Sequence, residues 1–196
     1  MPATPDAPTR LVRHAVAMSL DGYIAGPGGE YDWIVMDPTI DFAAIMARYD
    51  TYLIGRKTFA AGGAAMLGGS SVAVFSRTLR AEDHPGLRIV ADDVAGAVAD
   101  LRARPGKDLW LFGGGELFRS FLELGLVDEV EVAVVPVLLG GGIPLLPAPA
   151  RRTTLELKAS RTYPSGIVSL EYRVVRPAEG PPSGRKHART GSLKRR

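Results

Sequence analysis

The sequence predicts an α/β fold with a mostly parallel central sheet and an antiparallel C-terminal edge. Strand-like apolar runs alternate with amphipathic, helix-like segments as far as residue 125. Two further strand-like runs, 153–163 and 167–175, flank Pro164-Ser165-Gly166, which is typical of a hairpin. Alternating strands and helices favour parallel pairing, and a closing hairpin adds antiparallel strands.

Each element is expected from its own local pattern. Strands are expected where short apolar or β-branched runs end at turn-forming residues, at 11–20, 51–55, 71–76, 87–90, 109–112 and 127–139. Helices are expected where apolar residues recur every three or four positions. They are a helix over 41–49, a helix capped by Asp92 that buries Val94, Val98 and Leu101, and a helix from Leu117 to Leu124 that ends at Gly125.

The composition describes one soluble domain without metal or disulfide chemistry. The chain has 196 residues, 46% hydrophobic and 23% charged, which is enough to bury a sizeable core. The absence of cysteine excludes disulfides and thiolate sites, and three histidines argue against a His-rich metal site. The first ten residues lack a signal-peptide core, and no apolar run reaches membrane-spanning length. A cytoplasmic protein is therefore predicted.

Both ends of the chain are expected to be disordered around a domain at 11–176. Residues 1–10 form a polar leader, and 177–196 form a tail rich in Pro, Gly and Ser with six Lys or Arg and one Glu. Such a tail buries too little apolar surface to offset its ordering entropy. Nucleic-acid binding by the tail is the alternative to a solvated extension. The remainder of the chain is slightly acidic, which argues against a nucleic-acid partner.

Three glycines, Gly113 to Gly115, separate an expected strand from an expected helix. The start of a helix carries unpaired N–H groups and a positive dipole end, which together attract anions. Glycine would let a phosphate approach the backbone. The string is neither a GxGxxG fingerprint, since Phe118 stands at the last position, nor a phosphate-binding P-loop. A plain tight turn remains the alternative.

Two other strand ends carry residues suited to anions. In "IGRKTF", Arg56 and Lys57 stand at a helix start, where cations oppose the dipole unless a phosphate compensates. In "FSRT", Ser76 and Arg77 follow another strand. Solvated surface cations and a polar turn are the alternatives. Because ligands of open α/β sheets lie beyond the carboxyl ends of the strands, the three sites together favour one extended, phosphate-bearing ligand.

The ordered motifs resemble the dihydrofolate reductase superfamily, particularly its bacterial branch related to the C-terminal reductase domain of the bifunctional riboflavin-biosynthesis deaminase/reductase. "SLDGYIA", "YLIGRKTF" and "LFGGGELFRSFLELGLVDEVEVAVVPVLLGGGIPLL", with the final strand pair, span most of 11–175. The resemblance implies a dihydrofolate-reductase-like three-layer sandwich. It also implies an NADPH-dependent oxidoreductase acting on a pterin-like or pyrimidine substrate. A non-catalytic nucleotide-binding or sensor module of the same fold remains the alternative.

The resemblance assigns the cofactor contacts by position. It implies that the diphosphate lies at the glycines and the helix start, the 2′-phosphate at the "GR-x-T" segment, the adenosine near the third strand end, and the nicotinamide beside the first strand. The residues implied for the diphosphate are Gly113, Gly114, Gly115, Glu116 and Leu117. Those implied for the 2′-phosphate are Gly55, Arg56, Lys57 and Thr58. Ser76 and Arg77 are implied for the adenosine, and Ala17 and Ile24 for the nicotinamide.

The substrate side is defined by fewer residues. Asp41 matches the acidic residue of dihydrofolate reductases and is the catalytic candidate, although it could instead stabilise a helix dipole. Asp21 and Trp33 are further substrate-binding candidates, with turn formation and simple packing as alternatives. Phe112 stands where the riboflavin branch carries Glu, which weakens that substrate assignment. Relatives commonly dimerise, so a homodimer is expected, with the long apolar run 127–139 as a candidate contact.

Overall fold

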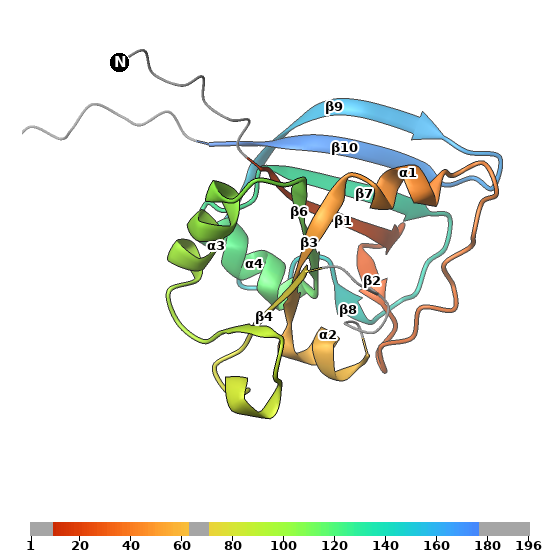
Figure 1. Ribbon diagram of the computed structural model, residues 1–196. Helices are drawn as coiled ribbons and strands as arrows, with labels where there is room; N and C mark the ends of the chain where they lie inside the picture. Colours follow the sequence, from red (N-terminus) through yellow and green to blue (C-terminus); the bar gives the residue numbers. More distant parts are fainter. Residues whose placement is uncertain (1–9, 63–70, 177–196) are drawn as a thin grey trace, which may run out of the picture.

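An eight-stranded sheet forms the centre of the computed structural model, which describes residues 10–62 and 71–176 (Figure 1). Its strand order is β5-β4-β3-β6-β1-β7-β10-β9. The strands are β1 (Val12–Ser19), β3 (Tyr49–Gly55), β4 (Ser71–Phe75), β5 (Arg88–Val90), β6 (Asp108–Gly113), β7 (Glu129–Val135), β9 (Thr154–Thr162) and β10 (Val168–Val175). The tail expected at 177–196 and leader residues 1–9 lie outside the described residues.

The strand directions confirm the predicted mixed sheet. The six strands from β5 to β7 are parallel to one another, β10 is antiparallel to β7, and β9 is antiparallel to β10. The hairpin expected around residues 164–166 therefore forms the antiparallel edge. A separate two-stranded sheet pairs β2 (Tyr23–Ala25) with β8 (Ile143–Pro144).

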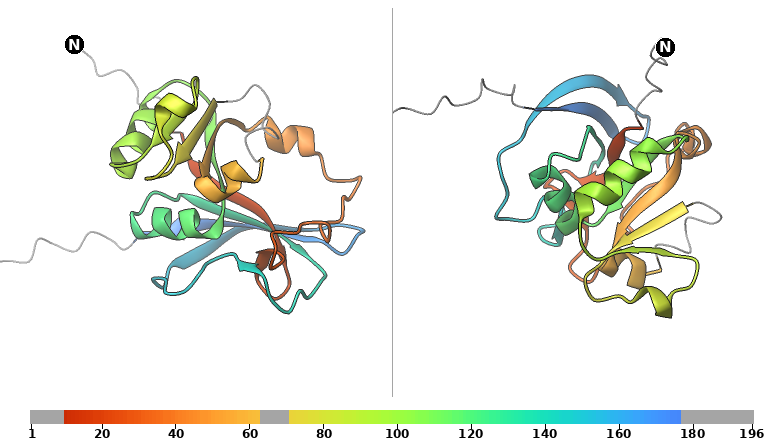
Figure 2. Two further views of the ribbon diagram at one scale, coloured as in Figure 1. Left: turned by 90° about the horizontal axis from the view of Figure 1, so that it is seen from below. Right: turned by 60° about the vertical axis from the view of Figure 1, so that its left-hand side comes forward.

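Helices cover both faces of the sheet, giving three layers. On the first face, α3 (Val94–Ala103) and α4 (Gly115–Glu123) pack against a core that includes Leu53, Leu109 and Leu111. On the second face, α1 (Phe42–Met46) and α2 (Arg56–Ala60) pack beside Tyr52, Ile54 and Trp110. The left view of Figure 2 shows α3 and α4 on one side of the sheet and α1 on the other. A short 3₁₀ helix spans Ala81–Asp83. None of the helices in the described stretches is long and apolar enough to cross a membrane.

Several element boundaries differ from the sequence-based expectation. The N-cap of α3 is Asp93, whose carboxylate accepts a hydrogen bond from Gly96 N at 3.0 Å, so the prediction of Asp92 was wrong by one residue. Tyr49 belongs to β3 instead of the preceding helix, because its ring is buried against Trp110. Arg10, assigned to the leader, is buried and donates to Leu101 O and Thr51 Oγ1.

The second face changes character along β1, β7 and β10. Across these three strands, the side chains form rows of residues directly paired in register, and every second row belongs to this face. From the amino end of β1 the rows are Arg13, Glu129 and Arg173; then Ala15, Glu131 and Glu171; then Ala17, Ala133 and Ser169. The face therefore passes from charged residues to small ones as it approaches the carboxyl end of β1.

Candidate functional site

Two of the glycine-containing strand ends meet at the carboxyl edge of the sheet. Ile54 of β3 pairs with Gly113 of β6, so Gly55 lies beside the triple-glycine turn. A β-carbon on Gly55 would stand 3.6 Å from Gly113 O and 3.7 Å from Leu117 Cβ. We call the two segments, Gly113–Leu117 and Gly55–Thr58, the cradle. The structure thus brings together nine of the residues expected to bind a cofactor.

The three glycines of the turn differ in how strongly the structure requires a glycine at their position. Gly113 has φ +117°, a backbone conformation that side chains disfavour. Gly115 is closely packed, because a β-carbon there would stand 2.6 Å from Pro144 O. At Gly114, by contrast, the nearest atom to such a carbon is Thr58 Oγ1, at 3.8 Å, and φ is −81°. Packing among the described residues does not demand glycine at this central position, which leaves room for a ligand. The Gly113–Gly114 peptide bond is cis.

Helix α4 begins inside the cradle with its amide groups uncapped by a side chain. Its N-cap is Gly114, which makes no side-chain capping hydrogen bond. The first N–H groups of a helix lack intrahelical acceptors and lie at the positive end of its dipole. Glu116 is the acidic residue of the first turn, and its Oε1 lies 3.2 Å from Lys57 Nζ of α2. A salt bridge between exposed side chains therefore joins the two halves of the cradle.

The other cationic residues also lie at the carboxyl edge. Arg56 begins α2 directly after β3 and is exposed. Gly55 of β3 pairs with Phe75, which places Ser76 and Arg77 at the neighbouring strand end. Arg77 is exposed, whereas Ser76 is buried and its Oγ accepts from Thr78 N and Leu79 N. Ser76 therefore shapes the turn that presents Arg77.

The end of β1 is tied to the segment after β7 by Asp21. Its carboxylate accepts hydrogen bonds from Ser19 Oγ at 2.7 Å, Gly140 N at 2.7 Å and Leu139 N at 3.1 Å. The bond from Ser19 and those from the two backbone amides lower the pKa of Asp21 below its usual range. This geometry gives Asp21 a structural role in the turn between Ala17 on β1 and Ile24 on β2. The proposed nicotinamide contacts of these two residues remain predictions.

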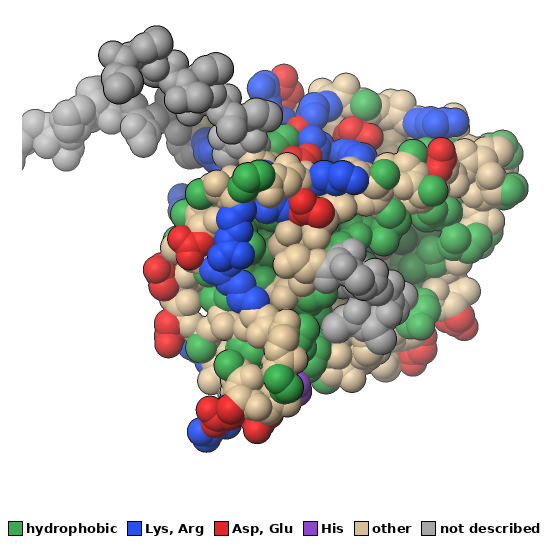
Figure 3. Space-filling view, viewed as in Figure 1, with side chains coloured by type: hydrophobic (Ala, Val, Ile, Leu, Met, Phe, Trp, Pro, Cys, Tyr) green, Lys and Arg blue, Asp and Glu red, His purple; other side chains and the backbone are tan. Residues whose placement is uncertain are grey.

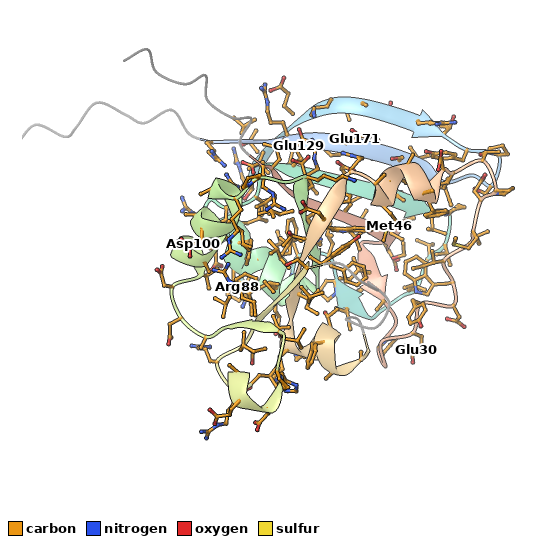
Figure 4. The ribbon with its side chains drawn as sticks, viewed as in Figure 1. Glu30, Met46, Arg88, Asp100, Glu129 and Glu171 are labelled. Atoms are coloured by element: carbon orange, nitrogen blue, oxygen red, sulfur yellow. The ribbon has the colours of Figure 1, made fainter. Side chains whose placement is uncertain are left out.

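An apolar cleft opens on the second face near the same edge. Figure 3 shows a hollow bordered by hydrophobic side chains, at the place where Figure 1 shows the ends of β1 and β7 below α1. Tyr52 Oη contacts Met46 Sδ of α1 at 3.9 Å, and the Trp110 ring centre lies 5.5 Å from those of both Tyr52 and Phe112. In Figure 4, Met46 points from α1 toward this region. An aromatic wall thus runs from α1 to the residue before Gly113.

The remaining substrate candidates lie in the segment between β2 and α1. Asp41 is exposed and is the N-cap of α1, with its Oδ1 accepting from Ala44 N at 2.8 Å. Trp33 is half-buried and donates from Nε1 to Glu30 O at 3.1 Å. The capping contact gives Asp41 a structural role at the start of α1, as the N-cap and not as a residue of the first turn. Contact of either residue with a substrate remains a prediction.

Asp37 anchors the same segment and was missed at the sequence level. The side chain is buried, and it accepts hydrogen bonds from Thr39 N at 2.8 Å, Thr39 Oγ1 at 2.6 Å and Ser165 N at 2.9 Å. These hydrogen bonds, those from Ser165 first, hold the pKa of Asp37 well below its usual range. The Asp-Pro-Thr string is a recognisable turn signal. Its partner in the β9–β10 turn is 128 residues away and leaves no local signal.

His14 is a second buried residue that the sequence did not single out. Its Nδ1 donates to Leu111 O at 2.7 Å, and its ring stacks on Phe118 of α4 at 4.0 Å between centres. A β-carbon on Gly113 would lie 3.8 Å from His14 Cε1, so the imidazole lies next to the glycine turn. Burial lowers the pKa of His14 to about 4, so the ring is neutral at physiological pH.

Two solved structures share this architecture. A Thermotoga maritima diaminohydroxyphosphoribosylaminopyrimidine deaminase/5-amino-6-(5-phosphoribosylamino)uracil reductase aligns with TM-score 0.67 and 17% identity, covering 85% of this chain and 57% of that one. An Enterococcus faecalis dihydrofolate reductase complexed with NADP(H) aligns with TM-score 0.64 and 16% identity, covering 84% and 96% of the two chains. The predicted dihydrofolate-reductase-like fold is thereby confirmed.

Sequence comparison defines the family more closely than the fold does. The uncharacterized protein YyaP of Bacillus subtilis is 36% identical over 172 residues, which span 80% of this chain and 91% of YyaP. The family model of the RibD C-terminal domain matches residues 10–169. The chain therefore belongs to the RibD C-terminal domain family.

Proposed function

We propose that this protein is an NADPH-dependent reductase of a planar pyrimidine or pterin-like substrate. The observation that carries the proposal is the direct junction between the cradle and the apolar cleft. Phe112 ends the aromatic wall of the cleft, and the next residue, Gly113, begins the cradle. A cofactor held in the cradle and a flat ring held in the cleft would therefore meet at the carboxyl end of β6.

The cradle residues fit a dinucleotide with a phosphate on its adenosine ribose. The amides at the start of α4 would hold the diphosphate, and Gly114 leaves room for it. Arg56 and Arg77, exposed at neighbouring strand ends, would bind the 2′-phosphate, which favours NADPH over NADH. NADPH, when bound, would supply the hydride that reduces a C=N bond to an amine as a proton reaches the nitrogen and NADP⁺ is formed.

The chain itself would orient the reactants and exclude water. Ala17 and Ala133 are paired small residues on the second face, so a ring can lie flat on β1 and β7. The Trp110 indole is fixed by donation from Nε1 to Ala15 O at 2.9 Å, which gives the aromatic wall a defined orientation. Placement of two reactants in such a fixed geometry is a large contribution to catalysis.

Cofactor titration tests the first part of the proposal. We expect saturable binding of NADPH, and a loss of affinity of about 10- to 100-fold in Arg56→Ala, because charge-assisted hydrogen bonds to phosphate are lost. The binding of NADH should change little in this variant. Arg104→Ala is the matched control, because Arg104 lies after α3, before the start of β6, at the opposite end of the sheet. The absence of NADPH binding by the unsubstituted protein would refute the proposal.

Turnover separates the reductase from a nucleotide-binding sensor of the same fold. The NADPH-loaded protein should oxidise the cofactor when a dihydropterin or an aminopyrimidine imine is added. Tight NADPH binding without turnover of any compound in this panel would favour the sensor. The decisive measurement is stoichiometric appearance of NADP⁺ and reduced product.

We also propose that the protein is a homodimer assembled through β9. The expected contact at 127–139 is not an edge, because β7 lies between β1 and β10. The edge strands of the described sheet are β5 and β9, and β9 is the longer one. All nine residues of β9 are exposed, Leu155 by 40% and Leu157 by 54%. A long exposed edge with apolar side chains favours pairing with a second chain. Light scattering should give a dimer mass, and Leu157→Lys should shift it to a monomer; a monomeric unsubstituted protein would refute this assignment.

A further inference from the structure

We propose that Arg48 is a positioning residue of the apolar cleft. Its two hydrogen bonds to Glu131 tie the α1 side of the cleft to β7, and they thereby set the separation between α1 and the sheet face on which a flat substrate would lie. The consequence for turnover rests on the proposed reductase function. The link itself can be measured without a cofactor or a substrate.

The two sides of the cleft belong to different parts of the sheet. Ala17 of β1 and Ala133 of β7 are direct neighbours on the second face, and we call this pair the floor. On the other side, Met46 of α1 contacts Tyr52 of β3. The left view of Figure 2 shows α1 standing apart from the ends of β7 and β10. Because β6 and β1 lie between β3 and β7, no strand pairing joins β3 to β7 directly.

Helix α1 makes few contacts that would fix its height above the floor. It has five residues, none of which is buried, and Phe42 and Met46 are 42% and 38% exposed. So short a helix has little stability of its own. The chain after it continues into β3, which fixes α1 relative to β3 but not relative to β7. The position of α1 relative to β7 therefore depends on side-chain contacts.

Arg48 supplies such a contact, two residues after the end of α1. Its Nη1 donates to Glu131 Oε2 at 2.9 Å, and its Nη2 donates to Glu131 Oε1 at 2.6 Å. A guanidinium that meets both oxygens of one carboxylate fixes the orientation of the pair as well as its distance. The carboxylate of Glu131 is itself held in place, because it is buried and also accepts from Arg13 Nη1 at 3.2 Å. The pair is thus a well-defined link from the end of α1 to β7.

Glu131 places this link directly beside the floor. It precedes Ala133 by two residues on β7, so the two side chains lie on the same face of the sheet. A gap of about 1 Å between packed groups removes up to half of their dispersion attraction. A flat ring that lies on Ala133 would therefore lose contact on its upper side if the link were broken and α1 moved away.

Glu171 provides a matched control for Glu131. The two carboxylates are paired directly across β10 and β7 on the second face, and Glu171 is half-buried (Figure 4). Both hydrogen bonds from the terminal nitrogens of Arg48 go to Glu131, and none joins Arg48 to Glu171. Glu131→Gln and Glu171→Gln each remove one negative charge near Arg48. Only Glu131→Gln replaces an acceptor oxygen of the link with an NH₂ group.

Spin labels measure the link without any ligand. The chain has no cysteine, so Phe42→Cys on α1 and Leu124→Cys at the end of α4 give one defined pair of labels. We expect pulsed electron paramagnetic resonance to give a narrow distribution of distances for this pair. Arg48→Met and Glu131→Gln should each broaden or shift the distribution, whereas Glu171→Gln should leave it unchanged.

A second pair of labels controls for loss of the fold. Arg104→Cys, after α3, with Leu124→Cys reports on the first face, away from α1, and its distances should stay constant in every variant. If Arg48→Met disturbs this second pair, Glu131→Gln decides the question, because it preserves the shape of the side chain. An unchanged Phe42–Leu124 distribution in Glu131→Gln, or an equal change in Glu131→Gln and Glu171→Gln, would overturn the inference.

Steady-state kinetics supply the functional measurement. With NADPH at saturation and 6-methyl-7,8-dihydropterin as the substrate, Arg48→Met should raise KM by about 10-fold and change kcat by less than about 3-fold. This division is expected when contacts common to the bound substrate and the transition state are lost. Arg48→Lys keeps the charge but not the paired donors, and it should recover part of the KM. A fall of kcat at unchanged KM in Arg48→Met would contradict the positioning role.

The dissociation constant of NADPH keeps the two proposals apart. It should be the same in Arg48→Met and in the unsubstituted protein, because the link lies outside the cradle. If the unsubstituted protein does not bind NADPH, the proposed function fails, and the label distances still decide whether the link exists. If NADPH binds and the distances do not respond to Glu131→Gln, only the present inference fails.

Discussion

Lys57 Nζ and Glu116 Oε1 lie 3.2 Å apart and join the start of α2 to the first turn of α4. Both side chains are mostly exposed, so the pair contributes little to stability. Its location gives it a different importance. It connects the two segments that would enclose the cofactor diphosphate, and it places a carboxylate at the uncapped start of α4.

The carboxylate of Glu116 should weaken cofactor binding. A negative charge in the first turn of α4 repels a diphosphate, and Lys57 compensates for it only in part. We expect Glu116→Gln to tighten NADPH binding by about 2- to 10-fold at low salt, and the gain to shrink as salt screens the repulsion. Isothermal titration at two ionic strengths measures this. Glu123→Gln, in the last turn of α4, should leave the affinity unchanged; a loss of affinity in Glu116→Gln would show that Glu116 itself contacts the cofactor.

Gly114 and Gly115 should respond differently to alanine. Gly115→Ala forces a methyl group against Pro144 O, so we expect a loss of stability of about 2 kcal/mol or more. Gly114→Ala meets only Thr58 Oγ1 at 3.8 Å, and the fold should tolerate it. The methyl group of the Gly114→Ala variant would occupy the space in which we propose that the diphosphate binds, so NADPH affinity should fall by about 10-fold or more. Thermal denaturation and cofactor titration of both variants check the contrast; equal NADPH affinity in Gly114→Ala and the unsubstituted protein would contradict it.

Asp41 can be divided into a capping role and an acidic role by two substitutions. Asparagine is as good an N-cap as aspartate, whereas alanine loses about 1 kcal/mol of stability. Because the carboxylate is exposed and bonded to Ala44 N, we expect Asp41→Asn to retain both stability and kcat. Asp41→Ala should be destabilised. The measurements are unfolding by denaturant and steady-state kinetics, and a 100-fold fall of kcat in Asp41→Asn would instead identify Asp41 as the proton donor.

His14 should make stability depend on pH in a defined window. Its pKa is about 4 in the folded protein and 6.5 in the unfolded chain. Between these pH values the unfolded chain binds more protons than the folded protein. The free energy of unfolding that His14 contributes is therefore fully present above pH 6.5 and decreases as the pH falls toward 4. The steepest slope is about 1.4 kcal/mol per pH unit.

Substitution of the ring isolates the effect of His14. In His14→Phe the stacking on Phe118 can persist, but the protonation difference is removed. The free energy of unfolding, measured by chemical denaturation between pH 5 and 6.5, should therefore depend less steeply on pH in the variant. Most carboxylates remain ionised in this range, so they add little to the pH dependence. Identical slopes in the two proteins would show that His14 is accessible to protons in the folded state.

The fold was largely predictable because its signals are local. Strand runs such as 51–55 end in glycine. The apolar stripe of the helix between Leu117 and Leu124 can be recognised from the spacing of its own residues alone. The resemblance supplied the expected order of motifs, and the pairing of Ile54 with Gly113 brings two of them together. Element ends were less predictable, because Asp92 and Asp93 are chemically identical and only the geometry of the turn selects one of them.

The features that the sequence did not reveal depend on distant partners. The local sequence around Asp37 indicates only an ordinary turn, because its hydrogen-bond donor Ser165 N is distant in the sequence. His14 lies in an apolar run, and only the packing of Phe118 and the carbonyl of Leu111 give it a role. The aromatic wall combines side chains of α1, β3 and β6, which no local periodicity connects. Sequence patterns therefore predicted more residues for the cofactor side than for the substrate side, and both sets remain predictions.

The three hydrogen bonds of Asp37 have a consequence for how a substrate would enter. They fasten the segment before α1 to the β9–β10 turn, so hydrogen bonds within the chain hold this segment in place. A ligand that arrives there does not have to immobilise a free loop, and most of its contact energy is retained as affinity. We therefore expect the selectivity of the cleft to depend on shape and desolvation and not on folding of this segment around a ligand.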